Sequence, residues 1–271
     1  MIQTGIQYDL HMHSNASDGV FLPAHLVKIA VSIGLSGIAI TDHDTLAGVD
    51  EGGMAAAAAG LEFIPGVEIS AQMDGHEVHL LAYGFRVGHS GLTDFLEEQR
   101  QARRARAVRF IEVLVDAGAL PSDVVLPDHD SIARPHLAGL LVEHGSAGTM
   151  QDAFTDFLVP GASTYVEKPL PTGPDVIRTV HDADGVVALA HPGHSTPHRV
   201  ILALLAAGLD GLEASHPSHD DMLETYYRDL AHAHGLLCTG GSDFHRPERG
   251  HMGSNGLNKL PPRLRPAART P

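Results

Sequence analysis

The sequence predicts an α/β fold in which helices surround parallel strands. Two observations support this prediction: strand-like and helix-like segments alternate along most of the chain, and seven strand-like segments run into a His, Asp or Glu at or near their C-terminal ends. Because parallel strands wrapped by helices present these ends on one face, we expect the side chains to converge there. The 271 residues, 43% of them hydrophobic, suit one such domain or one that carries an insertion.

The side chains at the seven strand ends are of the types that bind metal ions. In chain order, the segment around residues 8–10 leads to His11 and His13, and the segment 37–41 leads to Asp42, His43 and Asp44. Segment 63–64 leads to Glu68, 77–78 to His79, and 186–190 to His191. Segment 211–214 leads to His216, and 236–239 leads to Asp243 and His245. Imidazoles and carboxylates gathered in this way are typical of a multinuclear metal site. The sequence therefore predicts a metallohydrolase.

Helical segments separate the strands, and one stretch of the chain is helical throughout. Residues 23–34 and 45–59 are expected helices that end at a glycine, and either Asp44 or Thr45 is expected to cap the second. From residue 92 to 117 the chain reads as one long helix, and shorter helical pieces follow at 136–143 and 150–157 before the alternation resumes at 174–182. We expect a barrel domain (1–90 and 167–256), a helical insertion (91–166) and an irregular or disordered tail (257–271).

Composition limits the function classes. The net charge of −15 argues against a dedicated DNA or RNA groove, although metal ions could still attract phosphate substrates. Cys238 is the single cysteine, which rules out an intramolecular disulfide and a Cys-based zinc site. No apolar run follows a basic start, and none approaches the roughly 20 residues needed to span a bilayer. A cytoplasmic protein without membrane contacts is expected.

Local spacing sharpens the metal hypothesis. His11 and His13 are two residues apart on a strand, so both imidazoles would point to the same side. Such a pair is a weak signal by itself, but the whole run from Asp9 to Gly19 is much more specific. His43 is expected to point from its strand end toward the same site.

Six ordered segments resemble those of the PHP (polymerase and histidinol phosphatase) family: residues 9–19, 41–44, 66–70, 79–83, 190–192 and 241–245. The resemblance implies a distorted, TIM-like (β/α)7 barrel, which agrees with the seven strand segments. Within the family the chain is similar to the subgroup that hydrolyses nucleoside 3′,5′-bisphosphates and short RNA 5′ ends. That subgroup carries a helical insertion with an Arg-Pro-His run, present here as Arg134-Pro135-His136.

The resemblance also implies a set of metal ligands. Two to three divalent ions would be held by nine residues: His11, His13, Glu68 and Asp243 for the first, the bridging Glu68 with His79 and His191 for the second, and Asp18, His43 and His245 for the third. Asp18 stands where some members have a His, and this harder ligand slightly favours Mn or Fe over Zn. The identity of the metal stays open.

Metal ions of this kind indicate the chemistry. Close divalent ions can generate a bridging hydroxide near neutral pH and orient a phosphate, so no Ser or Cys nucleophile is required. Nucleophile-elbow, P-loop and Rossmann signatures are absent from the sequence. We therefore expect a hydrolase of phosphoric esters.

Four further residues are candidates for substrate contact. Arg134 offers a planar fork for a phosphate, whereas without the resemblance a surface arginine would be the simpler interpretation. His194 is expected to hold the phosphate that is not cleaved or to protonate the leaving group, and Lys168 to contact phosphate. His216 has either a pocket role or a structural one. The arginines between residues 100 and 109 are interpreted as a solvated helix face.

The favoured function is hydrolysis of the 3′-phosphate of nucleoside 3′,5′-bisphosphates, with short RNA 5′ ends as further substrates. The alternatives are a ribose cyclic-phosphate phosphodiesterase of phosphonate breakdown, a histidinol phosphatase, and a PHP module without activity. All nine ligand positions are intact, which favours an active enzyme. The oligomeric state cannot be inferred from the sequence.

Overall fold

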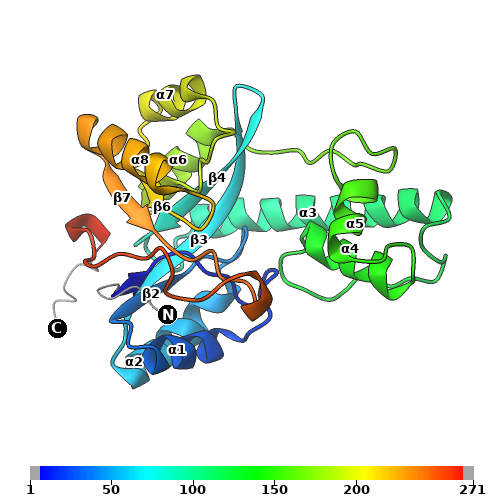
Figure 1. Cartoon of the computed structure of the whole chain (residues 1–271), viewed down its shortest axis with the longest axis horizontal. Helices are drawn as coiled ribbons and strands as arrows, with labels where there is room; N and C mark the ends of the chain where they lie inside the picture. The colour runs from blue at the N-terminus through cyan, green and yellow to red at the C-terminus, as the bar shows by residue number, and fades with distance from the viewer. Residues whose placement is uncertain (1–6, 265–271) are drawn as a thin grey trace.

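Seven strands form one sheet that is nearly closed into a barrel, with helices on its outside (Figure 1). The structure is a computed structural model and describes residues 7–264. The strands, which lie in the sheet in chain order, are β1 (Tyr8–Asp9), β2 (Gly37–Ile40), β3 (Glu62–Met73), β4 (His76–Tyr83), β5 (Val186–Leu189), β6 (Gly211–Ser215) and β7 (Leu237–Gly240). Backbone bonds from Leu10 N to Gly240 O (3.2 Å) and from His13 N to Phe244 O (2.9 Å) join the first strand to the last.

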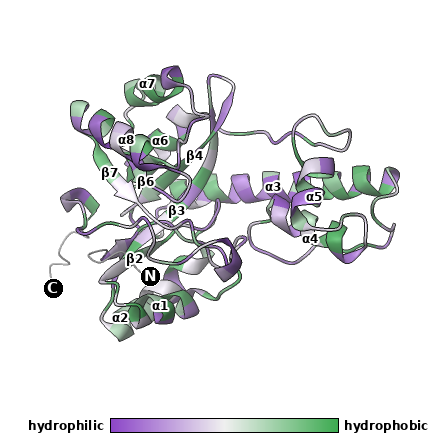
Figure 2. Cartoon of the chain, in the orientation of Figure 1, coloured by the Kyte–Doolittle hydropathy of each residue, from purple (hydrophilic) through white to green (hydrophobic). Residues whose placement is uncertain are grey.

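The helices that surround the sheet follow from local sequence. They are α1 (Pro23–Ser32), α2 (Ala47–Ala59), α6 (Gly173–Asp182), α7 (His198–Ala206) and α8 (Asp221–Ala233). In α1, Leu26, Val27 and Ala30 share the buried face. Figure 2 shows hydrophobic residues along α1 and α7 interrupted by hydrophilic ones, the pattern of helices with one buried face. Gly60 ends α2 in a left-handed conformation (φ 69°), as its position in the sequence predicts.

Strand β4 departs from the expected parallel arrangement. It runs antiparallel to both β3 and β5, because a tight Asp74-Gly75 turn, with both residues at positive φ, joins β3 to β4 without a helix. Glu68 therefore lies inside β3 and His79 in the first half of β4, so the expectation that they follow strand ends is wrong. Since β4 is reversed, its N-terminal half lies at the same barrel edge as the C-terminal ends of the parallel strands.

The helical elements between β4 and α6 leave the barrel. They are α3 (Ser90–Asp116), α4 (Arg134–Glu143), α5 (Met150–Ala153) and the π-helical turn Phe154–Leu158. Leu92 and Leu96 at the start of α3 pack into the barrel core, so the expected boundary at residue 91 falls inside a helix that spans both regions. The remainder of α3 forms a separate apolar cluster with α4 and α5, which Figure 1 shows at its far end.

The C-terminal segment from residue 257 to 264 is largely irregular, which is one of the two forms expected for it, and it is packed against the barrel. Leu257, Leu260 and Leu264 are buried in an apolar cluster with barrel residues such as Ile64, and Leu257 N donates to Tyr8 O (2.7 Å). Short 3-10 turns at Pro247–Arg249 and Pro262–Leu264 are the regular elements here. The prolines break helices and strands, but the leucines between them still have an apolar surface to cover. Residues 265–271 lie outside the described part of the chain.

Candidate metal centre

The nine residues predicted to bind metal ions lie together at one edge of the barrel. Three groups of these residues have ligand atoms within 4.8 Å of one another: His13, Asp18, His43 and His245; His11, His13, Glu68 and Asp243; and His43, Glu68 and His79. A fourth group of the same kind joins His11 to Glu213 and His216. His191, the ninth residue, places Nε2 2.9 Å from Glu68 Oε1. Residues separated by most of the chain therefore form one centre, and the ligand assignment drawn from the resemblance is geometrically possible.

Glu68 occupies the middle of this centre. Its Oε2 lies 3.3 Å from Nε2 of His11 and 3.1 Å from Nδ1 of His43, while its Oε1 lies 2.8 Å from Nδ1 of His79. The two carboxylate oxygens thus face different imidazoles. This is the geometry that a carboxylate needs to bridge two ions.

Two glycines let the ligand loops approach closely. A Cβ on Gly19 would lie 2.1 Å from the His13 carbonyl oxygen, and one on Gly241 would lie 2.4 Å from Cβ of His11. Neither position can therefore carry a side chain without moving the loop. Gly19 brings the loop that carries Asp18 against His13, and Gly241 brings the Asp243 loop over His11.

Two buried carboxylates hold the same loops in place through hydrogen bonds. Asp42 accepts hydrogen bonds from Ser14 N (2.7 Å) and Ser17 Oγ (2.7 Å), and Asp9 accepts from Ser242 N (2.9 Å). Asp42 is thus a loop anchor and not a member of the ligand groups. The expected cap of α2 by Asp44 or Thr45 is not found: the N-cap residue is Leu46, which makes no side-chain cap hydrogen bond, although Thr45 Oγ1 accepts from Ala47 N (3.1 Å) in the preceding turn. Asp44 instead binds Arg103.

Glu213 also belongs to this supporting layer, and the sequence analysis missed it. It is fully buried, and its two oxygens lie 3.0 Å from Nδ1 of His11 and 2.8 Å from the backbone N of His191. A charged residue between Leu212 and Ala214 in a buried strand was the available signal. Glu213 leaves Nε2 of His11 facing the centre.

The donor atoms fit divalent ions. Nδ1 and Nε2 of His13, Oδ1 of Asp18 and Nδ1 of His43 are buried and form no hydrogen bond with any residue in the described range. Buried polar atoms are rarely left without a partner, and metal coordination satisfies such atoms. Nitrogen and carboxylate oxygen donors also match Mn, Fe and Zn.

Charge is concentrated at this edge. Burial by itself raises the pKa of Glu68, but the neighbouring imidazoles, His43 and His79 foremost, hold it well below its usual range. Asp18 follows the same rule: burial raises its pKa and the imidazoles of His43 and His245 lower it well below the usual value. Both carboxylates are therefore ionised and available as ligands at neutral pH.

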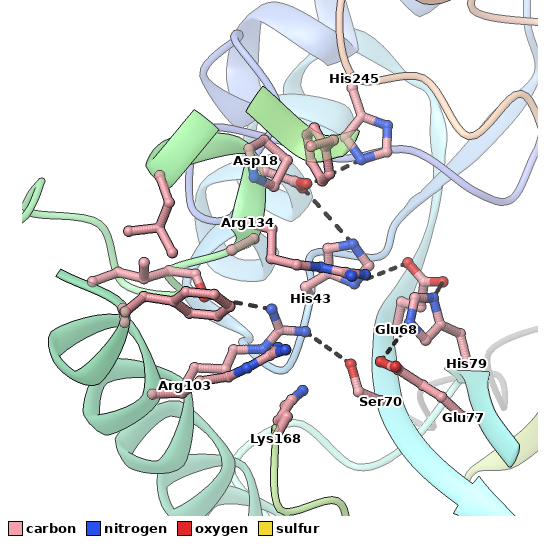
Figure 3. Close-up of a pocket in the computed structure, with 18 of the residues that line it drawn as sticks. Asp18, His43, Glu68, Ser70, Glu77, His79, Arg103, Arg134, Lys168 and His245 are labelled. Atoms are coloured by element: carbon pink, nitrogen blue, oxygen red, sulfur yellow. Dashed lines mark hydrogen bonds and ion pairs between the residues drawn. The ribbon is translucent and has the colours of Figure 1, made fainter. Parts of the chain in front are cut away.

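A pocket with a cavity volume of about 290 Å³ opens beside the centre. Its lining includes seven of the predicted ligands, Asp18, His43, Glu68, His79, His191, Asp243 and His245, together with the cationic side chains of Arg103, Arg106, Arg134 and Lys168 and the carboxylate of Glu77. Figure 3 shows Arg134 reaching from the start of α4 into this pocket and Lys168 at its lower edge. Two of the predicted substrate residues, Arg134 and Lys168, thus line the same pocket as the predicted metal ligands.

The other two predicted substrate residues lie outside the pocket lining. The loop after His191 turns at Gly193 (φ 54°), and the His194 side chain is 76% exposed, 3.9 Å from Asp220. The expected catalytic role of His194 therefore has no support in its position. His216 is buried behind the ligands with Nε2 3.5 Å from Oδ2 of Asp243, so it faces a ligand rather than the pocket.

Arg103 corrects the interpretation of the arginine run as a solvated face. It is 9% exposed, binds Asp44 through Nε, and donates through Nη2 to Ser70 Oγ (2.9 Å). Lys168 binds the same oxygen of Asp44 at 3.2 Å. The signal was present in the sequence: Arg103 lies on one helical face with Ala107, Phe110 and Leu114, which form the apolar stripe of α3.

A nearly closed barrel with convergent imidazoles and carboxylates beside a cationic pocket defines a metal-dependent phosphoesterase. Within the described residues, no helix is both long and apolar enough to cross a membrane. The comparison with protein families agrees, because the PHP domain matches residues 9–241. The chain belongs to the PHP family, which implies that it uses divalent metal.

Similar proteins share this fold over most of their length. The chain is 36% identical over 250 residues to the 5′-3′ exoribonuclease Rnm of Salmonella typhimurium, covering 89% of this chain and 85% of that protein. It is 33% identical over 269 residues to the 3′,5′-nucleoside bisphosphate phosphatase of Chromobacterium violaceum, covering 95% and 94%. A crystal structure from Bifidobacterium adolescentis, ascribed to a metal-dependent phosphoesterase, superposes with a TM-score of 0.84 at 34% identity, covering 94% and 93%. The chain is a hydrolase that acts on phosphoesters.

Proposed function

We propose that this phosphoesterase removes the 3′-phosphate of nucleoside 3′,5′-bisphosphates and accepts short RNA 5′ ends in the same pocket. The observation that carries the proposal is that candidate metal ligands and four cationic side chains line the same pocket. A substrate with two phosphates could place one group against the metal ions and the other against the cationic side chains. Two relatives in sequence are named as a bisphosphate phosphatase and an exoribonuclease, and this supports the proposed substrate class.

One arrangement accommodates both substrates. With the 5′-phosphate against Arg134 and Lys168, the 3′-phosphorus lies toward the metal-ligating side. In a bisphosphate this phosphorus belongs to a terminal phosphate, and in RNA it belongs to the phosphodiester that leads to the next nucleotide. Water adds to phosphorus, the bond from phosphorus to the 3′-oxygen breaks, and the 3′-oxygen takes up a proton.

The nine ligands are proposed to hold two to three divalent ions of Mn, Fe or Zn: His11, His13, Asp18, His43, Glu68, His79, His191, Asp243 and His245. When bound, such ions supply an activated water and positive charge for the cleaved phosphate. The chain's own part is to hold the ligands rigidly through Asp9, Asp42 and Glu213. Elemental analysis of purified protein should find more than one equivalent of transition metal, and one equivalent or none would contradict a multinuclear centre.

The substrate proposal is tested by a panel of phosphoesters at equal concentration. It contains a nucleoside 3′,5′-bisphosphate, a 5′-mononucleotide, a ribose 1,2-cyclic phosphate, histidinol phosphate and a 5′-phosphorylated RNA oligomer. The highest kcat/KM is expected for the bisphosphate. A higher value for the cyclic phosphate or for histidinol phosphate would replace the proposal with that activity, and no turnover of any member would favour a module without catalysis.

A further inference from the structure

The loop that follows β5 carries the proposed ligand His191 in an uncommon backbone conformation. His191 has φ 26°, and Gly193, two residues later, has φ 54°. Both values lie in the left-handed region, which a residue with a side chain such as His191 rarely adopts unless the neighbouring structure holds it there. The contacts of this loop therefore decide where the imidazole of His191 lies.

Both backbone polar groups of Gly193 are held by buried side chains. Gly193 N donates to Nε2 of His219 (3.0 Å), and the hydroxyl of Tyr227 donates to Gly193 O (2.6 Å). His219 is 8% exposed and Tyr227 is 2% exposed, and their ring centres lie 5.2 Å apart. These two side chains, here called the Gly193 clamp, thus hold one residue of the loop from two elements, the segment after β6 and helix α8.

The clamp is itself fixed to strand β6. Nδ1 of His219 lies 2.8 Å from the carbonyl oxygen of Ala214, so this nitrogen carries the proton and Nε2 is left to accept. Burial lowers the pKa of His219, which keeps the ring in this neutral form at pH 7. Ala214 directly follows Glu213, whose carboxylate accepts from His191 N at 2.8 Å. The end of β6 therefore supports the loop at two residues, His191 and Gly193.

We propose that His219 and Tyr227 are positioning residues for His191, holding its imidazole where it completes the second metal position with Glu68 and His79. The inference rests on the proposed ligand set and not on the identity of the substrate. Neither His219 nor Tyr227 is among the described residues that line the pocket, so both act through the backbone of the loop. Removing a partner that supports a metal ligand commonly weakens metal binding by about 10- to 100-fold.

Tyr227→Phe tests the clamp with the smallest change, because it removes the hydroxyl and keeps the buried ring. Binding of Mn²⁺ to the metal-free protein is followed by the electron paramagnetic resonance signal of the free ion. One Mn²⁺ position should bind about tenfold more weakly, while the others keep the wild-type affinity. Tyr226→Phe is the matched control, because the hydroxyl of Tyr226 lies 2.9 Å from Nδ1 of the exposed His198, and its loss should leave every Mn²⁺ affinity unchanged.

His219 is tested by a pair of variants. His219→Leu removes the acceptor for Gly193 N and should weaken the same Mn²⁺ position by at least about tenfold. His219→Gln offers a carbonyl oxygen to Gly193 N and should recover most of this affinity. Thermal melting separates positioning from stability, because added Mn²⁺ should raise the Tm of Tyr227→Phe and His219→Leu less than that of the wild type. A lower Tm of the metal-free variants with an unchanged rise on adding Mn²⁺ would overturn the proposal.

His191→Ala separates the clamp from the ligand assignment. If His191→Ala binds Mn²⁺ as the wild type does, His191 is not a ligand, and the proposed ligand set fails together with the clamp. If His191→Ala loses one position while Tyr227→Phe and His219→Leu keep all of them, the clamp alone is overturned. Losses spread evenly over all Mn²⁺ positions would also overturn it, because they would assign His219 and Tyr227 to the general stability of the barrel.

Discussion

Nδ1 of His11 lies 3.0 Å from Oε1 of Glu213, and both side chains are fully buried although 202 residues separate them. The second oxygen of Glu213 accepts from the backbone N of His191 at 2.8 Å. A single carboxylate therefore orients one imidazole and fixes the backbone of another proposed ligand. Such partners set the tautomer of a metal-binding histidine and raise its basicity.

Glu213→Gln should weaken metal binding by about 10- to 100-fold, the usual effect of removing a carboxylate that supports a metal-bound histidine. The amide can still accept one hydrogen bond but carries no charge. Metal affinity is measured by competition with a chromogenic chelator, and Glu224→Gln on α8 serves as the control. Wild-type affinity in a folded Glu213→Gln protein would show that the contact has no part in metal binding.

Glu68→Gln should lower the occupancy of two metal positions and abolish turnover, because Glu68 faces imidazoles through both of its oxygens. Metal content per chain by elemental analysis and kcat on the bisphosphate are the two measurements. Glu62→Gln at the start of the same strand should leave both unchanged. Full activity in Glu68→Gln would refute the bridging position.

Arg134→Ala should reduce kcat/KM for the bisphosphate by roughly 10²-fold, as expected when a charged hydrogen bond of ~3 kcal/mol is lost. Hydrolysis of p-nitrophenyl phosphate should fall far less, because this ester has no second phosphate. Parallel rate measurements on both substrates decide the point. Equal losses would assign Arg134 to the cleaved phosphate, and no loss would assign it to the protein surface.

Substrate affinity should depend on pH through Lys168. Burial lowers its pKa to about 8, with Arg103 adding to the effect and the carboxylates of Asp44 and Glu77 opposing it. The ammonium is present below that pH and is lost as pH rises through it, so KM for the bisphosphate should increase above pH 8. In Lys168→Arg this increase should be absent, because a guanidinium stays protonated. Superimposable KM profiles for the two proteins would remove Lys168 from the binding site.

The sequence determined much of the fold and of the metal centre by itself. The helices α1 and α2 follow from apolar spacing and from Gly60, and the ligands stand in short runs such as the one from Asp9 to Gly19. Local patterns of this kind can be read because the residues concerned are neighbours in the chain. Because most of these runs follow consecutive strands of a barrel, they lie together at one edge of it.

Tertiary structure alone decided the features that depend on distant partners. The reversal of β4 depends on pairing with β3 and β5, although the Asp74-Gly75 turn marked it locally. Both histidines outside the pocket, His194 and His216, stand in the same kind of strand-end position as true pocket residues, and only the path of their loops separates them.

The pocket arginines show the same limit most clearly. Arg103 and Arg106 belong to one arginine-rich stretch, and the sequence does not reveal that Arg103 binds Asp44 while Arg106 has no carboxylate of the described residues within 4.0 Å. Whether an arginine is solvated, paired or free to bind an anion depends on which elements pack against its helix. Chemistry at strand ends was therefore predictable from residue type and spacing, whereas the charge balance of the pocket depended on contacts made only after the insertion folds back beside the barrel edge.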